Sequence, residues 1–269
     1  MRVRQPELAE AIDMHLELLE LERRIMGRVS LPMLELSDSI VARHDAEARP
    51  LLKFEEIPLD LTDLRLMVRQ TADVLRRFGA LDEHDHRQVQ ALGRDMKLIT
   101  VVATWYRSAA ERHVAGVGRG SAATDPGLDE AAGQVLSQAM RPFLSRCAEV
   151  LQQHPALSAW RQSNCALCGG EPDFAVITPA AERHLICGRC ALRWKFEPLT
   201  CPFCRNSDRT RITSFATPDG QYRVYACDVC RRYLKAYDAR RASRPVMPVV
   251  DTIATLPLDA AAMQRGYTG

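Results

Sequence analysis

The sequence has no run of about 18 consecutive apolar residues, so it contains no segment long enough to span a membrane as a helix. Its N-terminal stretch lacks an apolar segment followed by a small-residue cleavage site, and we therefore expect no secretory signal. The motifs H-E-x-x-H, G-x-S-x-G and G-x4-G-K-[ST] are also missing. The sequence thus gives no support to a membrane protein or to these common classes of enzyme.

Cysteine, by contrast, is abundant and regularly spaced. Eight of the nine cysteines form four Cys-x-x-Cys pairs within residues 165–230. A tetrahedral centre with metal–sulfur bonds of about 2.3 Å needs sulfurs roughly 3.8 Å apart, a separation that a Cys-x-x-Cys turn provides. The spacers of 18 and 22 residues between sequential partners suit two such centres. The predicted metal ligands are Cys165, Cys168, Cys187 and Cys190 in one site, and Cys201, Cys204, Cys227 and Cys230 in the other.

Two other uses of these cysteines are open. Eight cysteines could form four disulfides, although disulfide frameworks belong to oxidising compartments and usually to small domains. A thioredoxin-like redox dithiol would use one Cys-x-x-Cys pair on a helix after a strand, whereas this chain has four pairs in tandem. Structural metal sites are the favoured interpretation. Eight cysteines that saturate two ions leave no open coordination position for a substrate, so we expect no enzyme.

The part of the chain before residue 160 shows the apolar periodicity of helices. Pro50 and Pro58 disfavour helix in the residues before them, which predicts an extended connector. Pro142 should kink or split the last helix. The pattern predicts helices over 6–28, 31–47, 60–78, 82–114 and 128–153, with the connector over 49–60.

The cysteine-containing part has the pattern of short strands. It predicts one hairpin over 173–178 and 183–186, and another over 210–215 and 221–225. A further strand over 191–200 should bury Leu192, Trp194 and Phe196 on one face, because these residues alternate with charged ones. We expect this strand to hold the two metal sites in a fixed orientation. Removal of metal should then unfold this part and leave the helices intact.

Three other features look like sites, and we interpret them as structural. Residues 82–86 combine acidic residues and histidines, but acidic residues are favoured at a helix N-terminus. Cys147 lies on an apolar stripe, as a buried small hydrophobic residue would. The glycine-rich segment 116–127 follows a helix, whereas a phosphate-binding loop follows a strand, so we expect a linker.

Several segments carry a resemblance to a known family. They are H-L-I-C-G-R-C-A-L-R-W from His184, C-P-F-C from Cys201, C-D-V-C-R-R-Y-L-K from Cys227 and the tail D-T-I-A-T-L-P-L-D over 251–259. Shorter matches over 49–52 and 58–60 extend the resemblance thinly toward the N-terminus. These segments are similar to the formate dehydrogenase accessory protein family, the FdhE type.

The resemblance implies a cytoplasmic maturation factor, without enzymatic activity, that binds the catalytic subunit of a formate dehydrogenase during assembly. It also implies two iron ions in rubredoxin-like sites of four cysteines each, although tetrahedral sulfur coordination suits zinc equally. A homodimer is left open. The expected fold is α+β and multidomain: an all-α helical domain over 1–160, two tandem rubredoxin-like or zinc-ribbon four-cysteine modules with short antiparallel hairpins over 161–198 and 199–245, and a tail over 246–269 with a short helix.

The main alternative is a zinc-ribbon protein that binds nucleic acid through a basic face. Residues 161–269 hold 16 Lys and Arg against 10 Asp and Glu, while residues 1–160 hold 20 against 24. Eight metal-bound thiolates would cancel most of this excess, so a nucleic-acid partner is not favoured. An electron-transfer protein, with iron centres bound by four cysteines each, is a third alternative. The arginines available to a basic face are Arg205, Arg209, Arg211, Arg223, Arg231 and Arg232.

Overall fold

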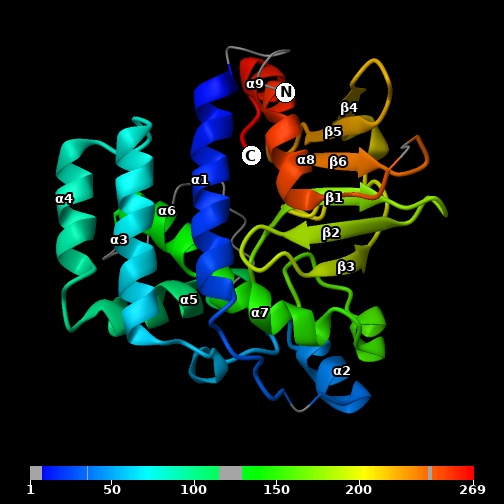
Figure 1. Ribbon diagram of the computed structural model, residues 1–269. Coiled ribbons are helices and arrows are strands. Elements are labelled where there is room, and N and C mark those ends of the chain that lie inside the picture. Colours follow the sequence, from blue (N-terminus) through cyan, green and yellow to red (C-terminus); the bar gives the residue numbers. More distant parts are fainter. Residues whose placement is uncertain (1–7, 35, 115–128, 242–243) are drawn as a thin grey trace.

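The computed structural model describes residues 8–34, 36–114, 129–241 and 244–269. In the view of Figure 1, the helices of the N-terminal half lie to the left of the sheet and below it. Two C-terminal helices lie against the sheet (Figure 1). The expected α+β architecture, with a helical part followed by a cysteine-containing sheet, is confirmed.

Seven α-helices form the described part of the N-terminal half. Local sequence signals set several of their ends. The Asp60 carboxylate accepts a hydrogen bond of 2.9 Å from the amide of Asp63 at the start of α3. The Asp82 carboxylate does the same for Asp85 at 2.8 Å, so the acidic cluster over 82–86 caps a helix, as predicted. The helices are α1 (Ala9–Met26), α2 (Asp38–Ala46), α3 (Leu61–Arg77), α4 (Glu83–Leu92), α5 (Leu98–Val114), α6 (Glu130–Ala139) and α7 (Arg141–Leu151), with 3-10 turns η2 (Phe54–Glu56) and η3 (Pro155–Ala159).

The predicted bounds of two helices are wrong. The helix expected over 31–47 begins only at α2, where the Ser37 hydroxyl accepts a hydrogen bond of 3.3 Å from the amide of Ile40. The helix expected over 82–114 is divided into α4 and α5. α4 ends at Gly93, a poor helix former, where a Cβ would lie 2.8 Å from Cγ of Arg69 in α3. The Asp95 carboxylate then accepts a hydrogen bond of 2.8 Å from the amide of Lys97, just before α5.

The last helix of this half is split at Pro142, as predicted. Pro142 lies in the first turn of α7, where a missing N–H costs little. The glycine-rich segment 116–127 lies outside the described residues.

Within the described part of the chain, the sheet has six strands in the order β3-β2-β1-β6-β5-β4. Both predicted hairpins are present as the antiparallel pairs β1–β2 and β4–β5. The sequence does not predict the parallel pair β1–β6, in which Phe174 lies opposite Lys235 and Ile177 opposite Asp238. The strands are β1 (Pro172–Ile177), β2 (Arg183–Cys187), β3 (Arg193–Phe196), β4 (Ile212–Ala216), β5 (Tyr222–Cys227) and β6 (Tyr233–Asp238).

The pair β1–β6 therefore joins the two hairpins into one sheet. The predicted strand over 191–200 exists as β3, and Trp194 and Phe196 are buried as expected. However, β3 is at the edge of the sheet, so it does not connect the two hairpins. The fixed orientation of the two cysteine groups comes instead from backbone hydrogen bonding in the middle of the sheet.

Strand β6 is buried along its whole length, because both faces of the sheet are covered there. Leu234 and Ala236 pack into the large core that also contains the helices of the N-terminal half. Tyr233 and Tyr237 alternate with them and pack on the opposite face. That face is covered by α8 (Pro248–Ala254) and α9 (Leu256–Gln264), so the tail holds two helices where one was expected.

Two carboxylates attach the tail to the sheet. The Tyr222 hydroxyl donates a hydrogen bond of 2.7 Å to the buried Asp251, and the Tyr233 hydroxyl donates one of 2.7 Å to Asp259. Lys235 adds an ion pair of 2.5 Å to Asp259. These are the two aspartates that bound the D-T-I-A-T-L-P-L-D segment, so the segment has a structural role in fixing α8 and α9.

Candidate metal centre

Each of the four Cys-x-x-Cys pairs is held by the same turn. The amide of the first cysteine donates to the carbonyl five residues later, and the amide four residues later donates back to the carbonyl of that cysteine. These eight hydrogen bonds measure 2.8 to 3.0 Å. Each turn therefore presents two sulfurs on one side of the backbone.

The turn requires a left-handed residue directly after its second cysteine. Glycine takes this position only once, at Gly169 with φ of 69°. The other three turns place Ala191, Arg205 and Arg231 there, with φ between 58° and 61°. A side chain in this conformation costs roughly 1–2 kcal/mol, so three of the four turns are strained and need support from the structure around them.

The four turns bring the eight cysteines together in two groups. The first group is Cys165, Cys168, Cys187 and Cys190, and the second is Cys201, Cys204, Cys227 and Cys230. Within each group all four sulfurs lie within 4.8 Å of one another. We call them the first cluster and the second cluster. The sequential pairing assumed from the spacers is thus the one that the structure has.

The sulfur–sulfur distances suit tetrahedral coordination. In the first cluster, Cys165 and Cys190 are 3.5 Å apart, as are Cys168 and Cys187. In the second cluster, the distances Cys201–Cys230 and Cys204–Cys227 are 3.7 Å and 3.6 Å. These values are close to the roughly 3.8 Å that bonds of about 2.3 Å require. Each cluster could therefore hold one metal ion.

The cysteines are not joined to one another. All nine are free thiols, which contradicts the disulfide alternative. Cys147 is fully buried in α7, and burial raises the pKa of its thiol to about 12. It is therefore a neutral hydrophobic side chain, as predicted.

The electrostatics of the clusters also suit a cation. In the first cluster, burial raises the pKa values of Cys165 and Cys190, while hydrogen bonds from the neighbouring thiols lower that of Cys168. Burial likewise raises the pKa of Cys204 in the second cluster, to about 11. The negative charges of four buried thiolates repel one another, and a bound divalent cation would neutralise part of that charge.

The helical half of the chain covers the first cluster. The amides of Leu51 and Leu52 donate to the carbonyls of Ala166 and Leu167 at 2.7 and 3.0 Å, so the connector before α3 pairs with the first cysteine turn. The hydroxyl of Tyr106, in α5, donates a hydrogen bond of 2.8 Å to the carbonyl of Leu52 and fixes the connector in turn. The first cluster is therefore part of the main core.

Two arginines, Arg183 and Arg232, connect the second cluster to the rest of the sheet. Arg232 follows the last cysteine and forms two hydrogen bonds of 3.1 and 3.0 Å with Glu171, next to the first cluster. Its guanidinium also lies 3.6 Å from the ring centre of Phe203, inside the third cysteine turn. Arg183, in β2, donates a hydrogen bond of 2.8 Å to the carbonyl of Thr200. No spacing or motif signals these contacts, because they form between distant parts of the chain.

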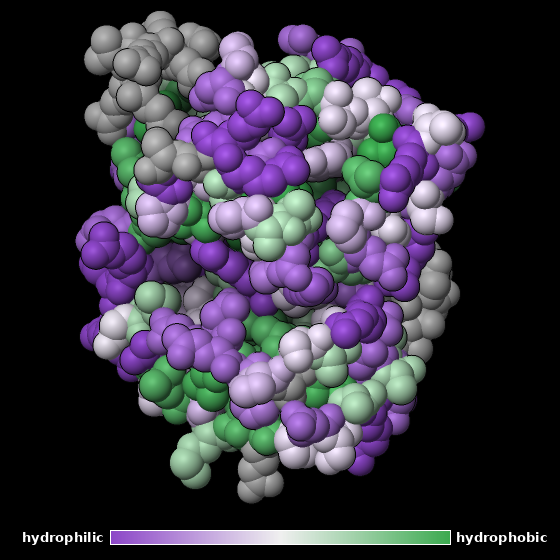
Figure 2. Space-filling view, turned by 90° about the vertical axis from the view of Figure 1, so that its right-hand side faces the viewer, coloured by the Kyte–Doolittle hydropathy of each residue, from purple (hydrophilic) through white to green (hydrophobic). Residues whose placement is uncertain are grey.

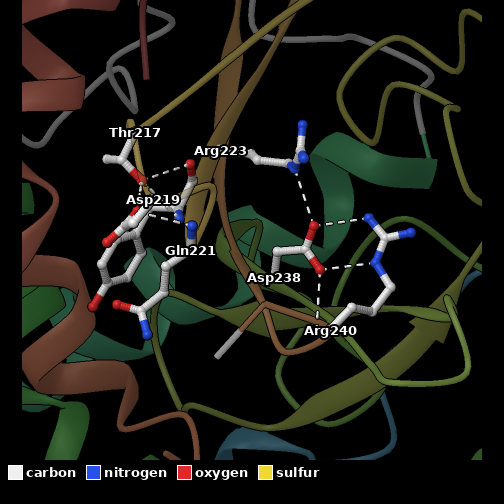
Figure 3. Close-up of polar contacts among 7 residues, drawn as sticks. Thr217, Asp219, Gln221, Arg223, Asp238 and Arg240 are labelled. Carbon is white, nitrogen blue, oxygen red and sulfur yellow. Dashed lines mark hydrogen bonds and ion pairs between the residues drawn. The ribbon is translucent and has the colours of Figure 1, made fainter. Parts of the chain in front are cut away.

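Three of the six arginines that suggested a basic face, Arg223, Arg231 and Arg232, pair with carboxylates. Arg223 pairs with the buried Asp238 at 3.0 Å, and Arg240 binds the same carboxylate at 2.7 Å (Figure 3). Arg231 pairs with Asp228 at 3.3 Å. The face turned to the viewer in Figure 2 mixes hydrophilic residues with small separate groups of hydrophobic ones. These contacts weaken the nucleic-acid alternative.

None of the helices in the described residues has the length and apolar character that crossing a membrane requires.

Comparison with known proteins places these features in context. No family model matches the chain. Proteins named FdhE homolog from Actinobacillus pleuropneumoniae serotypes 3 and 7 are each 26% identical to it over 132 residues, which are 48% of this chain and 43% of the relative. Another FdhE homolog, from Cronobacter sakazakii, is 26% identical over 106 residues, covering 38% of this chain and 34% of the relative. The matched region thus spans less than half the length of these relatives.

The fold gives a broader match. The crystal structure of the FdhE protein from Pseudomonas aeruginosa aligns with 97% of this chain and 87% of its own, with a TM-score of 0.60 and 16% sequence identity. At this identity the likeness shows the fold alone. The chain is thus similar in sequence to proteins named FdhE homolog over 38–48% of its length and shares the fold of an FdhE protein over nearly all of it, which supports the resemblance that the cysteine motifs carry.

Proposed function

We propose that the chain is a cytoplasmic, metal-binding accessory protein that binds the catalytic subunit of a formate dehydrogenase during its assembly. The observation that carries this proposal is the pair of four-cysteine clusters within an FdhE-like fold. The protein acts as a binding partner and not as a catalyst, because four sulfurs per ion complete a tetrahedral site.

The eight paired cysteines are the proposed metal ligands. A bound ion cross-links two turns that are distant in sequence and neutralises part of the thiolate charge. Iron is the proposed metal, on the basis of the family resemblance, and zinc suits the same four sulfurs. Backbone hydrogen bonds within each Cys-x-x-Cys turn hold the turn closed and keep its two sulfurs facing the other turn of the cluster.

Metal analysis tests the binding sites. We expect two metal ions per chain in protein purified without oxygen, with a visible absorption band if the metal is iron. The Cys147→Ser variant serves as a matched control, since Cys147 belongs to neither cluster, and it should retain both ions. A metal-free protein, or one with its eight paired cysteines oxidised to disulfides, would contradict the proposal.

Retention by a partner tests the proposed role. We expect the metal-loaded chain to be retained on an immobilised catalytic subunit of a formate dehydrogenase. Absence of retention with folded, metal-loaded protein would rule this role out. Homodimerisation stays a prediction, which sedimentation of the same sample would check.

A further inference from the structure

We propose that the second cluster is an exchangeable metal centre, open to small chelators and thiol reagents through Cys204 and Cys230, whereas the first cluster is closed. This inference rests on the proposed metal binding. Its basis is a difference in solvent exposure between two clusters that have the same four cysteine ligands and the same backbone turns.

The two clusters differ in exposure. All four cysteines of the first cluster are at most 1% exposed. In the second cluster, Cys201 and Cys227 are 4% and 2% exposed, while Cys204 and Cys230 are only half-buried. One sulfur-bearing residue from each turn of the second cluster therefore reaches the surface.

The covering of the clusters explains this difference. The first cluster is closed by protein on both of its turns. The connector at Leu51 and Leu52 pairs with one turn, and the Arg141 guanidinium of α7 donates a hydrogen bond of 3.2 Å to the carbonyl of Gly188 in the other. Access to this cluster requires the helical half to separate from the sheet. Such an opening breaks buried apolar contacts and is therefore rare.

The second cluster has less cover among the described residues: the C-terminal residues contact the turn over 227–231, but none of its cysteines belongs to the main core. Val229, between the last two cysteines, is 53% exposed, and Leu199, just before the third turn, is 36% exposed. A cavity of about 10 Å³ adjoins the cluster and is lined by Cys201, Cys227 and Arg183. That volume has room for about one water molecule. Solvent therefore approaches the second cluster from the side of the exposed pair, Cys204 and Cys230.

This geometry selects small, soft reagents. A chelator or a thiolate can reach a metal bound at the second cluster and replace one cysteine at a time, as in any ligand exchange. With iodoacetamide, the sulfur of Cys204 or Cys230 forms a bond to the methylene carbon as iodide leaves, and the metal–sulfur bond is given up. In the first cluster all four cysteines are buried, so the reagent cannot reach a sulfur until the core opens.

The test uses the full chain loaded with two zinc ions. Zinc release to excess 4-(2-pyridylazo)resorcinol should occur in two phases of one ion each, with the fast phase at least about tenfold faster than the slow one, because only the slow phase needs the core to open. Under iodoacetamide, peptide mass spectrometry should find Cys204 and Cys230 labelled first. The far-ultraviolet circular dichroism of the helices should not change during the fast phase.

Variants separate the two phases. Cys204→Ser should abolish the fast phase and keep the slow one, while Cys147→Ser should keep both. Release of both ions at one rate, or first labelling at Cys165 or Cys168, would overturn the inference. A wild-type chain that binds no zinc or iron would overturn the proposed function as well, so the two failures are distinguishable.

Discussion

At the scale of single residues, Arg183 is a buried arginine for which the described residues provide no carboxylate partner. Its side chain is buried, at 4% exposed, and its guanidinium lies 6.0 Å from the ring centre of Phe196 and 5.7 Å from that of Tyr225. Burial lowers its pKa to about 10, so it stays charged at neutral pH. Its contacts within the described residues are a carbonyl and two rings, with no carboxylate. The nearby thiolates of the second cluster are therefore its natural counter-charge.

Arg183→Gln should weaken metal binding at the second cluster and leave the first unchanged. Loss of a buried charge that faces thiolates should cost on the order of 1–3 kcal/mol, or roughly fivefold to 150-fold in affinity. Competition with a chromophoric chelator measures this for each ion. Arg209→Gln, which changes an exposed arginine in the same module, should have no effect. Equal affinities in Arg183→Gln and wild type would show that Arg183 is only a packing residue.

Asp238 provides a second prediction at this scale, with a defined pH window. Hydrogen bonds from Arg240 and Arg223 lower its pKa to about 2, although burial opposes the shift (Figure 3). Because the folded-state pKa lies below the unfolded value of about 3.9, the stabilisation is present above pH ~4 and is lost as the pH falls toward 2. A shift of this size corresponds to about 2–3 kcal/mol.

Asp238→Asn should therefore lower the free energy of unfolding by about 2 kcal/mol or more at pH 7, measured in urea. The difference from wild type should shrink below pH 4. Comparing the two proteins at each pH cancels the loss of metal that acid causes in both. A difference that stays constant from pH 7 to pH 3 would contradict this assignment.

At the scale of elements, the C-terminal residues brace the last cysteine turn. The Tyr267 hydroxyl donates a hydrogen bond of 2.6 Å to Asp228, and its ring centre lies 4.1 Å from the Arg231 guanidinium. The amide of Thr268 donates to the carbonyl of Arg231 at 2.8 Å. Arg231 is one of the strained left-handed residues, so the tail supports the turn at the position where it needs support.

Removal of residues 266–269 should speed metal release from the second cluster, because the turn over 227–231 loses these contacts. Tyr267→Phe, which removes only the hydrogen bond to Asp228, should have a smaller effect, equivalent to about 1 kcal/mol. Release from the first cluster should not change in either variant, since the contacts of residues 266–269 lie at β6, α9 and the turn over 227–231. Two-phase chelation kinetics measure both rates. Equal rates in the truncated and full chains would show that the tail does not support the turn.

At the scale of the whole molecule, one core extends from the helices into the sheet. It includes Leu75 of α3, Phe143 of α7 and Trp194 of β3, together with all four cysteines of the first cluster. The sequence alone predicts that the helical part survives metal loss. The shared core predicts that the helices survive loss of metal from the second cluster only. Loss of metal from the first cluster should affect them, because that cluster packs against both the helices and the sheet.

Cys168→Ser should therefore destabilise the helices as well as the sheet, and Cys204→Ser should spare the helices. Melting followed by far-ultraviolet circular dichroism, with limited proteolysis to identify the surviving part, compares the two variants. We expect the helical signal of Cys168→Ser to be lost at a lower temperature than that of Cys204→Ser. Indistinguishable helical melting in both variants would show that the two halves fold independently.

The sequence by itself determined those features that depend on neighbouring residues. The Cys-x-x-Cys turns, the cap at Asp60, the helix break at Pro142 and the two hairpins all follow from local spacing and side-chain chemistry. Even the division of the cysteines into two groups follows from their order along the chain.

Only the tertiary structure decided what depends on distant contacts. The parallel pair β1–β6 joins segments about 60 residues apart. The difference between the clusters has the same origin. Identical local turns give a closed and an open site because the helical half packs on one of them, and no local pattern of residues encodes which one.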